Sequence, residues 1–159
     1  MTFVSETKVI PIFPLDLVLF PNQDLPLRIF EPRYKQMIDD CMLGEKEFGV
    51  CLGHDNDTLS NWQAPYNIGT IAKIVDCKDV DSTSGHLFIN VRGRRKFRII
   101  RMISPSLKKT DDYDPFTLHG TKTIEQLHHT DGVGKKMYIQ AEIEMISEID
   151  ESISLVDWE

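Results

Sequence analysis

Apolar and polar residues alternate in the middle of the chain, from Tyr66 to Ile103. Every second residue from Leu87 to Val91 is apolar, and a period of two residues is typical of a strand with one buried face. A further alternating run follows Gly93 and places Phe97 on its apolar side. Two β-rich runs around a turn and a third run after a glycine predict consecutive antiparallel strands.

The N-terminal part of the chain predicts short strands followed by one helix. Lys8–Phe13 and Leu17–Phe20 are β-type runs interrupted by prolines, which predict a bent edge strand. Leu25–Phe30 alternates and predicts the next strand. From Pro32 the apolar spacing changes to three and four residues, up to Gly44. This spacing, with proline first and glycine last, predicts an amphipathic helix.

Beyond the helix, Phe48–Leu52 predicts a short buried strand, and residues 53–65 predict a polar loop. Residues 104–136 show no period and predict a long insertion loop. Met137–Ile146 alternates cleanly and predicts the strand that closes the sheet. Many short strands and one helix predict a mainly β fold with α (α+β), in which a small antiparallel β-barrel carries one principal helix.

The length of 159 residues predicts a single domain. We place this domain at residues 8–147, after a disordered lead at residues 1–7 and before a short terminal helix or tail at residues 148–159. Three widely spaced cysteines in apolar runs predict small core residues in a reducing compartment. Neither a signal peptide nor a membrane span is predicted, so we expect a cytoplasmic protein.

The net charge of −7 disfavours non-specific binding of nucleic acid by the chain as a whole. Charge is unevenly distributed, however. From Arg92 to Lys109 there are eight basic residues and no acidic one, whereas from Gln140 to Glu159 there are seven acidic residues and no basic one. If these two segments are neighbours in space, their charges largely cancel.

Several ordered sequence blocks resemble the N-terminal, substrate-binding domain of Lon-type ATP-dependent proteases. The blocks are IPIFPLDLVLFPNQDLPLRIFEPRYKQMI, FGVCL, NIGTIAKIVD and GHLFINVRGRRKFRI, and they cover roughly residues 9 to 103. The resemblance implies a PUA-like β-barrel and a role in binding polypeptides. The phosphate loop of the Lon ATPase module does not occur in this sequence.

Candidate chemistry outside this resemblance is sparse. Two groups of histidines and carboxylates lack the spacing of structural zinc sites, so we expect solvated loop residues and no metal or other cofactor. No nucleophile elbow or paired carboxylates are found, and we expect no enzymatic activity. Ser82–Ser84 predict a turn. The two histidine groups are His54 with Asp55 and Asp57, and His128 and His129 with Asp131.

One basic run could serve an alternative function, because a PUA-like barrel can bind RNA and basic side chains contact phosphates. Phe97 is the only aromatic residue of the run, and the alternation places it inside. Cross-strand ion pairs with Glu142 and Glu144 would account for the charge without RNA. We therefore expect no nucleic-acid partner. The run consists of Arg92, Arg94, Arg95, Lys96, Arg98 and Arg101.

The predicted helix offers the candidate peptide-binding residues. Arg33 and Tyr34 begin it, and the methionines Met37 and Met42 suit an adaptable apolar groove. The preferred hypothesis is a non-enzymatic module that binds other proteins or unfolded polypeptides, through a groove beside the helix or along an open strand edge. The alternatives are the RNA-binding protein above and a structural adaptor that docks onto a protease or ligase. The partner and the oligomeric state stay open.

Overall fold

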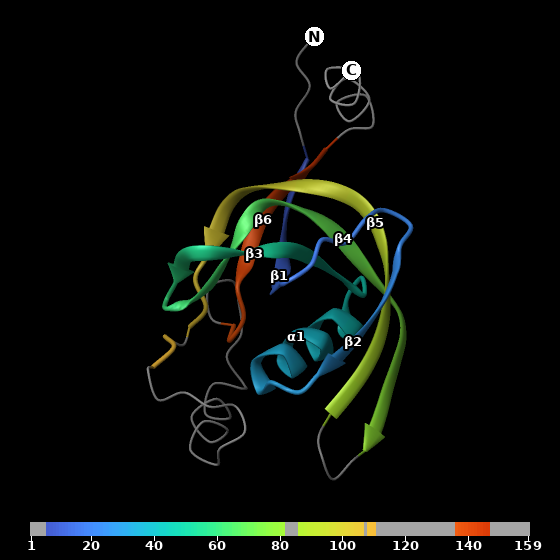
Figure 1. Ribbon diagram of the computed structural model, residues 1–159. Coiled ribbons are helices and arrows are strands. Elements are labelled where there is room, and N and C mark those ends of the chain that lie inside the picture. The colour runs from blue at the N-terminus through green and yellow to red at the C-terminus, as the bar shows by residue number, and fades with distance from the viewer. Residues whose placement is uncertain (1–5, 82–85, 107, 111–135, 147–159) are drawn as a thin grey trace.

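A computed structural model of the chain describes residues 6–81, 86–106, 108–110 and 136–146 (Figure 1). Its strands form a six-stranded sheet in the order β2-β5-β4-β3-β1-β6, and a further pairing between β5 and β6 closes five of them into a ring. The mainly β fold with one helix is therefore confirmed. The elements are β1 (Thr7–Leu15), β2 (Asp24–Ile29), α1 (Pro32–Leu43), β3 (Glu47–Leu59), β4 (Trp62–Asp81), β5 (His86–Ile103) and β6 (Gln140–Met145).

The ring contains one parallel pair, which the antiparallel prediction did not include. β1 and β3 run side by side in register from Ile12 opposite Gly49 to Leu15 opposite Leu52. Parallel neighbours need a long connection, and β2 and α1 provide it here. The other strand pairs are antiparallel.

β1 lies inside the sheet, between β3 and β6, so the predicted edge position was wrong. The N–H of Ile12 donates to the carbonyl of Ile139 on the β6 side. Because N–H groups alternate in direction along a strand, a donor at position 11 would face β3 and one at position 14 would face β6. β1 pairs with β6 only up to Pro11 and with β3 only from Ile12. Neither Pro11 nor Pro14 therefore removes a hydrogen bond that the sheet needs.

β5 is one continuous strand, and the predicted break at Gly93 was wrong. The segment between β1 and β2 crosses β5 at this glycine. The N–H of Asn22 donates to the carbonyl of Gly93, and the N–H of Gly93 donates to the carbonyl of Gln23. A Cβ atom at position 93 would lie 2.1 Å from the Phe20 carbonyl oxygen. Glycine is required here by a close approach of two backbones rather than by a turn.

The polar segment after Phe48–Leu52 is a hairpin, not the predicted loop. β3 continues to Leu59, and β4 begins at Trp62 opposite it. Ser60 and Asn61 form the turn with φ values of 52° and 66°, as a two-residue hairpin turn of type I′ requires. Neither residue is glycine, so the usual sequence signal was missing. Trp62 and Gln63 are the first two residues of β4 in this hairpin.

The helix α1 lies at one end of the ring, beside β2 (Figure 1). Pro32 is at its start, and Gly44 ends it by donating its N–H to Cys41. Its apolar face is buried in one of two core clusters, together with inward side chains of β2 to β5. The second cluster fills the ring between β1, β5 and β6. The predicted amphipathic helix and the inward side of β5, including Phe97, are confirmed.

The closing strand is also confirmed, although β6 is shorter than Met137–Ile146. Tyr138 and Gln140 are buried as well as the apolar residue between them. Tyr138 donates its hydroxyl hydrogen to Asp40 of α1 at 2.6 Å, because the helix covers that end of the ring. The predicted disordered lead was one residue too long, because Thr7 already belongs to β1 and pairs with Glu144. Residues 1–5 of this lead, most of the 104–136 insertion and the 148–159 tail lie outside the described residues.

Candidate binding groove at the start of α1

A groove of about 450 Å³ opens where the end of β1, β2 and the first turn of α1 meet. Seven of its twelve lining side chains are aromatic or aliphatic, and the other five are polar or charged. Such a mixed lining can contact apolar groups and also donate or accept several hydrogen bonds. The lining residues are Phe13, Pro14, Leu15, Asp16, Leu27, Arg28, Ile29, Phe30, Glu31, Arg33, Tyr34 and Gln63.

One wall of the groove is a free strand edge. Within the described part of the chain, β2 pairs with β5 and with no other strand. Backbone groups on its other side are therefore without a strand partner, although Pro26 has a carbonyl and no N–H to offer. The remaining groups leave an edge that can pair with another extended chain. Leu27 and Ile29 belong both to this strand and to the groove lining.

A column of stacked side chains forms the wall at the helix start. The Phe13 and Tyr34 rings stack with centroids 4.1 Å apart. The Arg33 guanidinium carbon lies 4.3 Å from the Tyr34 ring centre and 3.7 Å from that of Trp62. On Trp62, the Lys109 Nζ atom lies 5.9 Å from the ring centre. Cation–π contacts of this kind fix the guanidinium between two rings.

Arg33 is a buried cation with incomplete hydrogen bonding. Only 7% of its surface is exposed, and its Nε donates to Glu31 Oε2 at 3.1 Å. Its Nη1 has no hydrogen-bond partner among the described residues. Burial also raises the pKa of the neighbouring Tyr34 to about 12, so its hydroxyl stays protonated at neutral pH.

The structure separates the four peptide-binding residues expected from the helix pattern. Arg33 and Tyr34 line the groove, although both are largely buried. Met37 is fully buried in the core behind them, and Met42 is 39% exposed but is not part of the groove lining. The helix therefore contributes its first turn, rather than a methionine face, to the groove.

Several lining residues were not singled out from the sequence. Leu27 and Phe30 belong to a strand that was predicted, but its edge position depends on the whole sheet order. Gln63, which lines the groove, and Trp62, which stacks on Arg33, were assigned to a polar loop, because the Ser60–Asn61 turn lacks the glycine that usually indicates a hairpin. The nearest signal was a tryptophan within an otherwise polar segment, since such a large apolar ring is seldom left exposed.

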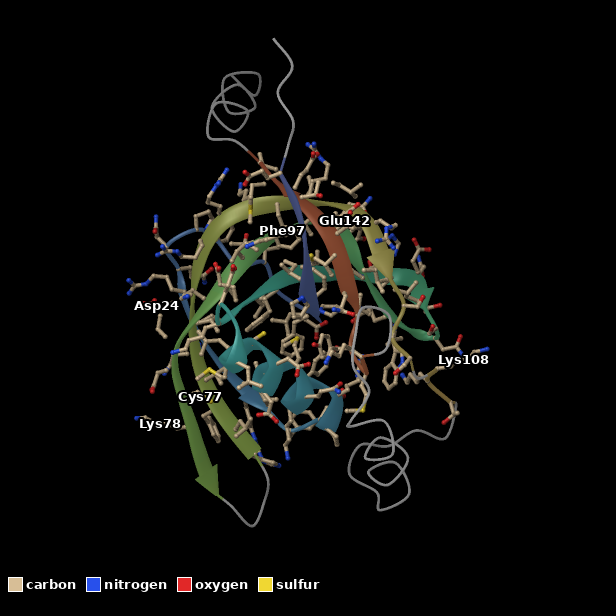
Figure 2. The ribbon with its side chains drawn as sticks, turned by 180° about the vertical axis from the view of Figure 1, so that it is seen from behind. Asp24, Cys77, Lys78, Phe97, Lys108 and Glu142 are labelled. Carbon is tan, nitrogen blue, oxygen red and sulfur yellow. The ribbon has the colours of Figure 1, made fainter. Side chains whose placement is uncertain are left out.

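The basic run lies on the outer side of β5, away from the groove lining. Arg92 contacts Asp24 at 2.9 Å and, by hydrogen bonding, lowers the pKa of that carboxyl. Arg98 contacts Glu144 at 3.2 Å, so one of the two expected cross-strand ion pairs is confirmed. Figure 2 shows Glu142 on β6, which pairs with β5, and Phe97 beneath the arch of β5.

The remaining basic side chains of this run form no ion pair within the described residues. Glu142 lies opposite Arg101 in the β5–β6 register, but no ion pair joins them. Part of the basic run therefore stays uncompensated by the described residues. The unpaired set is Arg94, Arg95, Lys96 and Arg101.

The other chemical candidates are ordinary surface or core groups. His54 Nδ1 accepts the N–H groups of Asn56 and Asp57, and no cluster of three potential metal ligands occurs in the described ranges. Burial raises the pKa of the Cys41 and Cys51 thiols to about 12. The second histidine group and the predicted Ser82–Ser84 turn lie outside the described residues.

No helix in the described part of the chain is long and apolar enough to cross a membrane.

Comparison with known proteins identifies relatives of the whole fold. The family model for the ATP-dependent protease La (LON) substrate-binding domain matches residues 9–158. The chain is similar to a Lon N-terminal domain protein from Xanthomonas campestris, with 28% identity and a TM-score of 0.56, over 88% of this chain and 60% of that one. It also shares the fold of the N-terminal domain of the Mycobacterium avium complex Lon protease, with 16% identity and a TM-score of 0.51, over 89% and 56%.

Proposed function

Because the chain belongs to the family of substrate-binding domains of the ATP-dependent protease La (Lon), we propose that it is a non-enzymatic module that binds extended segments of other polypeptides. The matched family is the substrate-binding part of these proteases, not their catalytic part. The chain spans only 60% and 56% of the two structures above. Any role in delivering polypeptides to a protease, and a location in the cytoplasm, are therefore parts of the proposal.

The observation that carries this proposal is the groove beside the free edge of β2. An extended segment placed along this edge would pair its backbone with β2. Its alternate side chains would then contact the apolar wall formed by Leu27, Phe30 and Tyr34. Phe30 is 37% exposed, so it can contact a bound chain without any rearrangement.

Fluorescence anisotropy with a labelled, permanently unfolded polypeptide tests the proposal. The probe is reduced and carboxymethylated α-lactalbumin, and the decisive variant is Phe30→Asp, which places a charge in the apolar wall. We expect the dissociation constant to rise by about tenfold or more, equivalent to about 1.4 kcal/mol.

The matched control is Leu43→Asp, the same change at the far end of α1, where the side chain is 89% exposed and outside the groove. A second control reverses charge on the outer side of β5 with Arg94→Glu and Arg98→Glu. Both controls should bind like the unmodified protein. Equal affinity of Phe30→Asp and the unmodified protein, or a loss of binding only in the β5 variant, would count against the groove.

A further inference from the structure

A bulge in β5 brings basic side chains together on the outer side of the ring. The register of β4 and β5 shifts between Thr70 and Ala72, where β5 has one residue more than β4. A β-bulge of this kind changes the direction of the side chains next to it. Arg94 and Arg95 are consecutive residues and are nevertheless both exposed, and Lys96 after them is half-buried. We call these last three residues the basic corner.

The basic corner has no counter-charge within the described residues. On either side of it, Arg92 contacts Asp24 and Arg98 contacts Glu144. The three cations between these two pairs form no ion pair in the described part of the chain. Because charges of the same sign repel one another at short separations, an anionic group at this corner would stabilise the protein.

One edge of β5 is also without a neighbouring strand at the basic corner. Within the described residues, β2 pairs with β5 only up to Arg92, and β6 pairs with it only from Phe97. The N–H of Ile146 donates to the carbonyl of Lys96 at the end of β6, which leads up to the arch of β5 (Figure 1). The residues that follow Ile146 in the sequence therefore start at the basic corner.

An exposed apolar residue lies next to the basic corner. The carbonyl of Phe20 approaches Gly93, the residue before Arg94, and 60% of the surface of Phe20 is exposed. The protein therefore offers cations and an apolar ring close together at this edge of β5. A segment that carries both carboxylates and apolar side chains can contact both features.

The segment after β6 has this complementary composition. Residues 147–159 contain five carboxylates and no basic side chain. The first two carboxylates, those of Glu148 and Asp150, flank the apolar Ile149. Because the segment is joined directly to β6, its effective concentration at the corner is on the order of millimolar. An acidic protein or a nucleic acid would have to compete with it from solution.

We propose that the acidic segment of residues 147–159 binds to the basic corner, with Glu148 and Asp150 as the counter-charges of Arg94 and Arg95. Arginine and carboxylate groups form strong, charge-assisted hydrogen bonds. The segment thereby covers a part of β5 that would otherwise attract phosphate groups. This contact is separate from the groove at the start of α1, so it does not depend on the function proposed above.

Competition for the basic corner tests the proposal in the full chain. The probe is a fluorescein-labelled oligonucleotide of about twelve uridines, because its phosphates bind exposed basic side chains. The variant Glu148→Gln with Asp150→Asn should bind this probe about fivefold more tightly than the unmodified protein, as expected from the loss of two exposed ion pairs. Adding Arg94→Gln and Arg95→Gln to this variant should abolish the gain in affinity. Fluorescence anisotropy at low ionic strength gives the dissociation constants.

The matched control is Asp55→Asn with Asp57→Asn, which changes the net charge by the same amount on the exposed part of the β3–β4 hairpin. The control should bind the probe with an affinity within about twofold of the unmodified protein. Equal gains in the variant and the control would show that only net charge matters, and would overturn the proposal. Tight binding of the probe by the unmodified protein, lost in Arg94→Gln with Arg95→Gln, would also overturn it, because the corner would then be a free nucleic-acid site.

NMR signals of the arginine side chains test the same contact without any probe. In the ¹⁵N-labelled unmodified protein, the Nε–Hε protons of Arg94 and Arg95 should exchange slowly with water. Both signals should shift and exchange faster in the Glu148→Gln with Asp150→Asn variant, and neither should change in the control. Identical arginine signals in this variant and the unmodified protein would overturn the proposal.

Discussion

The guanidinium carbon of Arg33 lies 3.7 Å from the centre of the Trp62 ring. This contact joins the first turn of α1 to the β3–β4 hairpin, two parts of the chain that the strand pairings do not connect. Tyr34 and Phe13 extend the stack to β1. The groove wall is thus built from three separate segments, and its shape depends on the ring of Trp62.

Replacing Trp62 should therefore lower the stability of the protein. Trp62→Ala removes a ring that is 3% exposed and should lower the free energy of unfolding by about 3 to 5 kcal/mol. Trp62→Phe keeps a ring against Arg33 and should cost clearly less. Urea denaturation followed by circular dichroism gives the free energy of unfolding of each variant. An equal loss of this free energy in the two variants would argue against the stacking role of Trp62.

The crossing of two backbones at Gly93 gives a second prediction. Gly93→Ala would place a Cβ atom 2.1 Å from the Phe20 carbonyl oxygen, and overpacking of this kind costs about 1 to 3 kcal/mol. Gly44→Ala is the control, because its Cβ would lie 3.7 Å from the nearest atom and should change stability by about 0.5 kcal/mol or less. Thermal unfolding of both variants measures the difference. A Gly93→Ala protein as stable as Gly44→Ala would contradict the crossing.

The buried thiols should be unreactive in the folded protein. The thiolate is the reactive form of cysteine, and burial raises the pKa of Cys41 and Cys51 to about 12. Cys77 is only half-buried. Titration with Ellman's reagent at neutral pH should modify Cys77 first, and the other two thiols only after denaturation. Rapid labelling of Cys51 in the native state would show that its strand is not packed as described.

Alkaline pH should destabilise the protein through the same buried groups. Burial raises the pKa of Tyr34 from 10.0 to about 12, so the folded state holds the phenol proton more tightly than the unfolded state. The contribution of Tyr34 to the free energy of unfolding is complete below pH 10 and is lost as the pH rises toward 12. The corresponding contribution of the buried Cys41 and Cys51 thiols begins to be lost from about pH 9 upward. The urea concentration at the midpoint of unfolding should decrease as the pH rises across this range. Above pH 10 this decrease should be smaller for the Tyr34→Phe variant than for the unmodified protein. Identical curves for the two proteins would exclude this role of Tyr34.

The sequence was informative wherever one local pattern decided the outcome. The period of two residues placed Phe97 inside, and the change of period at Pro32 located α1. Ion pairs of the basic run with Glu142 and Glu144 were expected from the charge pattern, and the pair of Arg98 with Glu144 is one of them. For Phe97 and α1, the residues that determine the structure are neighbours in sequence or lie on one predicted face.

The groove depends on relationships that no local pattern contains. The free edge of β2 follows from the order of the whole sheet, and the parallel β1–β3 pair from the path of the chain through β2 and α1. Gly93 was interpreted as a turn because the contact that requires it comes from Phe20, far away in sequence. Arg33 was predicted as a peptide contact, but its stacking on Trp62 depends on a hairpin that the sequence did not indicate.

Chemical-shift mapping of a bound, unfolded polypeptide on the ¹⁵N-labelled protein tests the central claim most directly. The account predicts that shifts concentrate on the lining of the groove, at Leu27, Phe30 and Gln63, and spare Leu43 at the other end of α1. Shifts concentrated instead on the outer side of β5, around Arg94 and Arg98, would contradict it.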